Sequence, residues 1–184
     1  MTKFFNIEFQ YRPIGQGLFY TGVINHSPSG NKFTMVYDCG TNSIFRYIER
    51  EIDVFKRKIK VGDKLDLLII SHFHQDHISH IPNLLRETNG AKLVVLPFLS
   101  PEELLLSYND NLLTDGDTLP QDFFVNPARF LIQEYKVDEV VFIHPSPSEG
   151  EYDSTTDGSK IIIPPNKTEG FEFDFQNNLV ELPT

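Results

Sequence analysis

Cysteine, tryptophan and long apolar runs are scarce or missing in this sequence of 184 residues. It has one cysteine and no tryptophan. The lone Cys39 excludes an intramolecular disulfide and favours a reducing compartment, so we expect a cytoplasmic protein. No apolar run approaches the ~18 residues that a membrane-spanning helix needs. The opening stretch MTKFFNIEFQYRP alternates apolar and polar residues, which predicts a strand and not a signal peptide. A membrane partner is not expected.

Positive charge is scarce in the second half of the chain. Residues 1–100 hold 12 lysines and arginines against 9 aspartates and glutamates, whereas residues 101–184 hold 4 against 17. The net charge of −10 therefore comes from the second half. Such a surface repels phosphate backbones, which disfavours broad nucleic-acid binding. Bound metal ions could still create a local cationic site.

The composition, 40% hydrophobic and 23% charged, is that of an ordinary globular protein, and we expect one domain over residues 1–184. In the first part of the sequence, apolar and polar residues alternate as they do in the strands of a sheet. The pattern predicts strands over residues 4–11, 18–25 and 32–40, joined as an antiparallel meander. Apolar residues three or four apart over 43–60 then predict an amphipathic helix.

Helices and strands alternate in the remainder of the sequence. Strands are predicted over 67–70, 91–98 and 138–144, and helices over 81–88, 100–113 and 126–136. The first of these strands, LLII, is wholly apolar, which predicts burial on both faces. A loop over 145–159 precedes two late strands, 160–165 and 171–176. This order predicts a mixed α/β fold whose sheet carries helices on its outside.

Four of the six histidines fall between positions 72 and 80, directly after the apolar run. The first three belong to the pattern H-F-H-Q-D-H. In an extended loop, His72 and His74 point to the same side and can share one ion, while Asp76 and His77 can reach a second ion at a later bend. Imidazole with carboxylate suits Zn²⁺, and also Mn²⁺ or Fe²⁺. The alternative is a surface loop that is rich in histidine by chance, which the position after a buried strand disfavours.

The stretch DLLIISHFHQDHI resembles the signature of the metallo-β-lactamase superfamily. Two earlier stretches extend the resemblance: YDCGT, and IGQGLFYTGVI, which is similar to the competence-type DNA-internalisation branch. The resemblance implies an αββα sandwich and a metal-dependent hydrolase. It leaves the substrate open, because the superfamily includes lactamases, thioesterases, phosphodiesterases, nucleases and oxidoreductases, although the branch points toward nucleic acid or a nucleotide.

The resemblance also implies roles for single residues. His72 and His74 would bind a first metal ion together with a later histidine, and Asp76 and His77 would bind a second. Asp76 would also orient the attacking hydroxide. Asp38, at the end of a predicted strand, would steady the ligand loop through hydrogen bonds. From the sequence alone, a turn-capping aspartate is an equal alternative for Asp38.

The sequence departs from the family pattern after the motif. Ser79 and His80 stand where the family usually has two glycines. We expect His80 to be an exposed residue at a helix start, with an extra metal ligand or a hydrogen-bond donor to a ligand as alternatives. His144 is the only histidine after position 80, so it is the candidate for the third ligand of the first ion. A strand-end histidine bonded to the backbone is its alternative.

The last part of the family pattern, a Gly-Asp strand end and a final histidine, has no counterpart in FEFDFQNNLVELPT. We therefore expect a C-terminal domain or partner chain to supply the missing ligands, or else a site with one ion or none. The first hypothesis is a hydrolase that cleaves a phosphodiester or other ester-like bond of a small-molecule, nucleotide or nucleic-acid substrate. The second is a non-catalytic binding or assembly module. The intact motif favours the enzyme.

Overall fold

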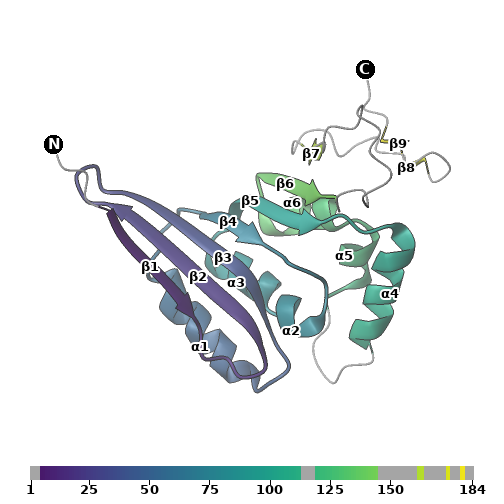
Figure 1. Ribbon diagram of the computed structural model, residues 1–184, viewed down its shortest axis with the longest axis horizontal. Helices are drawn as coiled ribbons and strands as arrows, with labels where there is room; N and C mark the ends of the chain where they lie inside the picture. Colours follow the sequence, from purple (N-terminus) through teal and green to yellow (C-terminus); the bar gives the residue numbers. More distant parts are fainter. Residues whose placement is uncertain (1–4, 113–118, 145–160, 164–172, 175–178, 181–184) are drawn as a thin grey trace, which may run out of the picture.

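A computed structural model describes residues 5–112, 119–144, 161–163, 173–174 and 179–180 (Figure 1). Its strands are β1 (Phe5–Tyr11), β2 (Gly17–His26), β3 (Asn31–Thr41), β4 (Leu65–Ile69), β5 (Ala91–Pro97), β6 (Glu139–Ile143), β7 (Ile161–Ile163), β8 (Phe173–Asp174) and β9 (Leu179–Val180). Its helices are α1 (Phe45–Lys56), α2 (Gln75–Ile78), α3 (Ile81–Glu87), α4 (Pro101–Leu112), α5 (Gln121–Val125) and α6 (Pro127–Tyr135).

Seven strands form one sheet in the order β1 to β7. The first three pair antiparallel, as the predicted meander requires. Strands β3, β4, β5 and β6 then run parallel, and β7 pairs antiparallel with β6. Strands β8 and β9 pair with each other. The predicted mixed α/β class is confirmed.

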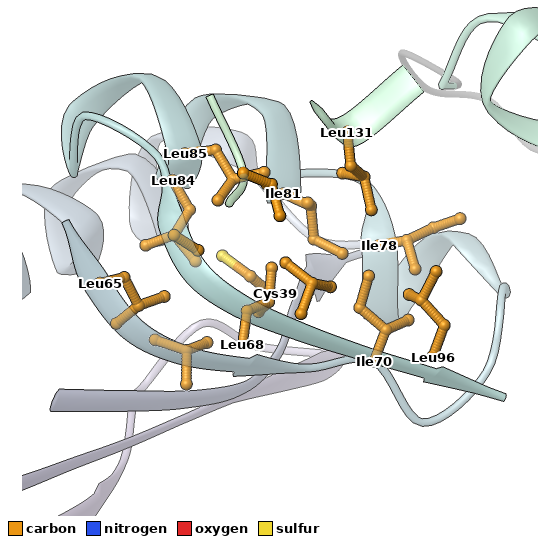
Figure 2. Close-up of a cluster of buried hydrophobic side chains, with 14 of the residues drawn as sticks. Cys39, Leu65, Leu68, Ile70, Ile78, Ile81, Leu84, Leu85, Leu96 and Leu131 are labelled. Atoms are coloured by element: carbon orange, nitrogen blue, oxygen red, sulfur yellow. The ribbon is translucent and has the colours of Figure 1, made fainter. Parts of the chain in front are cut away.

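One face of the sheet is buried beneath helices. Val36, Leu68, Val94 and Val140 are register neighbours across the four parallel strands, and all four are fully buried. Helices α1, α3 and α6 cover this face (Figure 1). Side chains from the strands and helices meet in a continuous apolar cluster around Cys39 (Figure 2). Packing in this core therefore fixes the position of the carboxyl end of β3 relative to that of β4.

The opposite face of the sheet is less covered than the sequence predicted. Leu67 and Ile69 alternate with the buried Leu68 and are partly exposed. The prediction that this strand is buried on both faces was therefore wrong. On β1, the side chains of Phe5, Ile7 and other alternate apolar residues are exposed. Helices α1, α3 and α6 do not lie over this face (Figure 1).

Several boundaries follow the sequence signals. The Ser-Pro-Glu-Glu start of α4 is a capping box: the backbone N–H of Ser100 donates to Glu103 Oε2 at 2.7 Å, and the Glu103 N–H donates to Ser100 Oγ at 3.3 Å. Helix α3 ends before Asn89 and Gly90, both at positive φ. Helix α5 was not predicted, and α1 ends at Lys56 and not near residue 60.

The late predicted elements are only partly described. The strand predicted over 160–165 corresponds to β7, and that over 171–176 to the two residues of β8. The loop predicted over 145–159 lies outside the described residues. Among the helices that are described, none has the length and apolarity required to span a bilayer.

Candidate metal centre

The histidine motif lies at the carboxyl edge of the parallel strands. Strand β4 ends at Ile69, the chain then runs extended, and α2 begins at Gln75 with His74 at its N-cap (Figure 1). Strand β3 brings Asp38 to the same edge from 33 residues earlier than Ser71. Loops at this edge are where α/β sheets usually carry chemistry.

Phe73, between the first two histidines, anchors the motif in the core. Its ring is buried and packs edge-on against Phe123 and Phe124 of α5, with centroids 5.3 and 6.4 Å away. Its carbonyl accepts a hydrogen bond of 2.7 Å from Asn111 Nδ2 of α4. Alternation along the extended segment then leaves His72 partly exposed and His74 exposed. The motif thus presents imidazoles outward from a rigid base.

Asp38 occupies a strained position on β3. The pairing of β2 with β3 shifts register at Phe19 and Tyr20, whose partners are Cys39 and Tyr37. Asp38 is the extra residue of this bulge, with φ of 56° and a fully buried side chain. Bulges redirect side chains, and a non-glycine residue at positive φ is common where function requires the strain.

The carboxylate of Asp38 is held by three hydrogen bonds. Ser71 donates its backbone N–H to Oδ1 at 2.7 Å and its hydroxyl to Oδ2 at 2.5 Å. Nδ1 of His77 lies 2.7 Å from the same Oδ2. Nδ1 of His72 lies 2.8 Å from Ser71 Oγ. Asp38 therefore connects both histidines, one directly and one through Ser71.

These contacts determine which ring nitrogen of each histidine carries a proton. An ionised carboxylate only accepts hydrogen bonds, so Nδ1 of His77 must donate to Asp38. The Ser71 hydroxyl has one proton and donates it to Asp38. Nδ1 of His72 must therefore be the donor in its contact with Ser71 Oγ. In each neutral imidazole, Nε2 then keeps its lone pair for a metal ion, the arrangement that carboxylates commonly impose on metal-binding histidines.

The structure groups the motif residues differently from the sequence prediction. Three potential ligand atoms lie within 4.8 Å of one another, one each from Asp38, His72 and His77. The rings of His72 and His77 are 3.8 Å apart between centroids, and those of His72 and His74 are 4.8 Å apart. The first two predicted partners are thus adjacent, but His77, assigned to the second ion, lies closer to His72.

The side chain of Asp76 lies beside that of His77. Its Oδ2 is 3.7 Å from Nε2 of His77. Two ligand atoms on one tetrahedral Zn²⁺ stand roughly 3.3 Å apart, given bonds of about 2.0–2.2 Å. The distance between these atoms of Asp76 and His77 is therefore close to that between two ligand atoms on one ion.

Burial lowers the pKa of His72, and the nearby His77 and His74 lower it further. Desolvation penalises the imidazolium, and neighbouring positive charge has the same effect. The neutral form is the one that binds metal ions, so the environment favours binding at this position. Cys39, by contrast, is not a thiolate ligand, because burial and then Asp38 raise the pKa of its thiol.

Two glycines let the strand and the motif approach closely. A Cβ on Gly40 would lie 2.5 Å from the backbone carbon of His77 and from the nitrogen of Ile78. One on Gly17, at φ of +142°, would lie 2.7 Å from the carbonyl oxygen of Asp76. The absence of a side chain at both positions permits this packing.

His80 was expected to be exposed, and this was wrong. It stands at the N-cap of α3, but its side chain is buried, with the ring edge-on to Phe45 at 4.8 Å and Nδ1 3.0 Å from Ser79 Oγ. Its backbone N–H donates to the Cys39 carbonyl at 2.9 Å. These contacts give His80 a packing environment that only the folded chain reveals.

His144 lies beyond the carboxyl end of β6 and is exposed. Its ring stacks on Phe98, 3.9 Å away between centroids and 22° from parallel. His144 is not part of the group of three potential ligands. Its predicted role as a third ligand stays a prediction.

The chemistry of this donor set fits a divalent transition metal. Two imidazoles with available Nε2 atoms and nearby carboxylates are suitable ligands for Zn²⁺, Mn²⁺ or Fe²⁺. Asp38 can serve as a ligand or as the group that orients His77. Sequence reasoning missed the contribution of Ser71, although its place directly before His72 was a signal.

The α/β sheet carries histidines and carboxylates that could hold a metal ion at the carboxyl edge of its parallel strands. Residues 20–163 match the sequence model of the metallo-beta-lactamase superfamily, and the chain belongs to this superfamily. A comparison with curated proteins gives no match.

Proposed function

We propose that the protein is a metal-dependent hydrolase that cleaves a phosphodiester or another ester-like bond. Members of the superfamily are often metal-dependent hydrolases, and the group of Asp38, His72 and His77 could hold an ion. The observation that carries the proposal is the hydrogen-bond chain from Asp38 to Nδ1 of both histidines. It prepares two Nε2 atoms for metal binding, which a purely structural histidine cluster does not require.

His72 and His77 would hold one ion through Nε2, with Asp38 keeping both rings oriented. His74 and Asp76 would add ligands to the same ion or to a second one. When bound, the metal lowers the pKa of a coordinated water and polarises the scissile group. Zn²⁺ is the first choice, with Mn²⁺ and Fe²⁺ as alternatives.

Asp76 would orient the attacking water, since its side chain is partly exposed beside His77. Water adds to the phosphorus or carbonyl carbon, the bond to the leaving oxygen breaks, and a proton passes to that oxygen. The products are an acid and an alcohol. A cytoplasmic location is part of the proposal and agrees with the lone, buried Cys39.

The experiment combines metal analysis with hydrolysis. Purified protein supplemented with Zn²⁺ should retain about one ion or more per chain and hydrolyse an activated ester or phosphodiester of p-nitrophenol. His77→Ala should lose both properties, whereas His26→Ala, whose ring contacts Ser29 in a hairpin, should keep them. Less than a tenth of an ion per chain in the supplemented wild type would overturn the proposal.

A second candidate function is a binding or assembly module completed by a C-terminal domain or partner chain. The exposed apolar residues of β1, Phe5, Ile7, Phe9 and Tyr11, favour it, because contiguous exposed apolar surface commonly marks an interaction site. Such a module would retain metal without hydrolysing either substrate. Activity that appears only when a second polypeptide is added would identify a partner-completed site.

A further inference from the structure

A cavity of about 740 Å³ lies next to the metal centre. Its floor is a register row of the sheet, formed by Tyr37, Ile69 and Val95. Ser71 lines the cavity and is also the residue that donates two hydrogen bonds to Asp38 and contacts His72. The cavity is therefore continuous with the residues that orient the histidines.

The walls of this cavity are built by the chain segments that follow β5 and β6. The N–H of Phe98 donates to the Ile143 carbonyl at 2.8 Å, which joins the two strand ends. The Phe98 ring stacks on His144 and stands edge-on to Phe142, 6.4 Å away between centroids. Phe98, Leu99 and Ile143 thus present apolar groups from a fixed backbone. The volume is within the range of ligand sites, which commonly measure about 300–1,000 Å³.

The charge of the lining is unsuited to phosphate. Among the described residues that line the cavity there is no lysine or arginine, and the one carboxylate side chain is that of Glu103. The capping box with Ser100 holds that carboxylate at the cavity. A phosphodiester in this cavity would bring a second negative charge near Glu103, where His144 is the one side chain among the described lining residues that can become a cation. An uncharged group meets no such repulsion.

We infer that this cavity binds the apolar acyl group of an uncharged ester whose carbonyl lies at the metal centre. The inference rests on the proposed function and narrows its substrate class from ester-like bonds in general to carboxylic esters with an apolar acyl group. Water adds to the ester carbonyl carbon, the bond to the alkoxy oxygen breaks, and the alcohol leaves with the proton. The acyl chain lies along Ile69 and Val95, against Phe98.

Binding and turnover test the inference separately. The binding probe is 2-decanone, an uncharged ketone that cannot be hydrolysed, followed by methyl NMR of the full chain. It should shift the methyl signals of Ile69 and Ile143, and Phe98→Ala should weaken its binding by about fivefold or more. The control Val125→Ala removes an exposed apolar side chain of α5 and should change the affinity less than twofold. No shift at either isoleucine in the wild type overturns the inference.

Turnover is measured on Zn²⁺-supplemented protein with p-nitrophenyl acetate, p-nitrophenyl octanoate and bis(p-nitrophenyl) phosphate. The kcat/KM for octanoate should exceed that for acetate by at least about tenfold, since each buried methylene favours binding. Phe98→Ala should reduce this ratio. If the phosphodiester is the best substrate, the substrate inference fails and the proposed function stands. If no substrate turns over but the ketone binds, the proposed function fails and only the apolar site remains.

Discussion

Nδ1 of His77 lies 2.7 Å from Oδ2 of Asp38, although 39 residues separate the two in the sequence. The bond joins a bulged residue of β3 to the first turn of α2. Because the carboxylate is fully buried, the bond is protected from competing water. The orientation of the His77 imidazole in α2 therefore depends on a residue of strand β3.

Replacement of Asp38 should weaken metal binding without unfolding the chain. Asp38→Asn keeps the shape and tolerates the φ of 56°, but it loses the negative charge that favours the His77 donor. We expect Zn²⁺ affinity to fall by about 10–100-fold, the usual effect of removing such a partner. Competition with a chromophoric chelator measures it. Asp53→Asn on α1 is the control. If both variants lost the same amount of Zn²⁺ affinity, the assignment of Asp38 to the metal centre would be refuted.

His74 should contribute to metal retention even though its side chain is exposed. Its ring lies 4.8 Å from that of His72, in reach of a shared ion. We expect His74→Ala to lower the metal content measured by elemental analysis, and His26→Ala to leave it unchanged. Equal metal contents in the two variants would refute the assignment of His74.

The stability of the metal-free protein should fall in mild acid partly because of His72. Its folded pKa is below 6.5, so the unfolded chain binds more protons in the window just below pH 6.5. The free energy of unfolding therefore decreases as pH falls through 6.5. Thermal unfolding at pH 7.5 and 5.5 should show a smaller decrease in Tm for His72→Gln than for the wild type. An identical decrease in both proteins would show that His72 does not contribute.

A side chain at Gly40 should displace the motif. The added Cβ would clash with the backbone of His77 and Ile78, which cannot rotate away. We expect Gly40→Ala to destabilise the protein by about 2–3 kcal/mol, a typical overpacking cost, and to lower metal content. Gly30→Ala meets no atom within 4 Å and adds only the strain of its φ of +69°, about 1–2 kcal/mol. Chemical denaturation compares the two.

The sequence was sufficient to place the motif because local signals agreed there. A short apolar run predicted a buried strand, and the polar candidate ligands that follow it had to emerge at the strand's carboxyl end. The capping box at Ser100 and the stop at Asn89-Gly90 are likewise local. Such features depend on neighbours a few residues away, so one sequence contains the information.

Other features depend on contacts between distant segments. The bulge at Asp38 arises from the pairing of β2 with β3, and the burial of His80 requires Phe45 from another helix. Helix α5 has five residues, too few for a 3.6-residue period, and is held by the burial of Phe123 and Phe124. The closeness of the His72 and His77 rings likewise depends on the turn at α2, which the spacing of the motif alone does not reveal.

Phe73 links the histidine motif, residues 72–77, to helices α4 and α5. Because its ring packs on α5 and its carbonyl bonds to Asn111 of α4, the backbone between the first two histidines cannot open while those helices remain docked. Local opening of the loop must therefore involve α4 and α5 in the same cooperative event. Amide hydrogens in all three segments would then exchange with solvent at related rates, and a bound ion would slow them together.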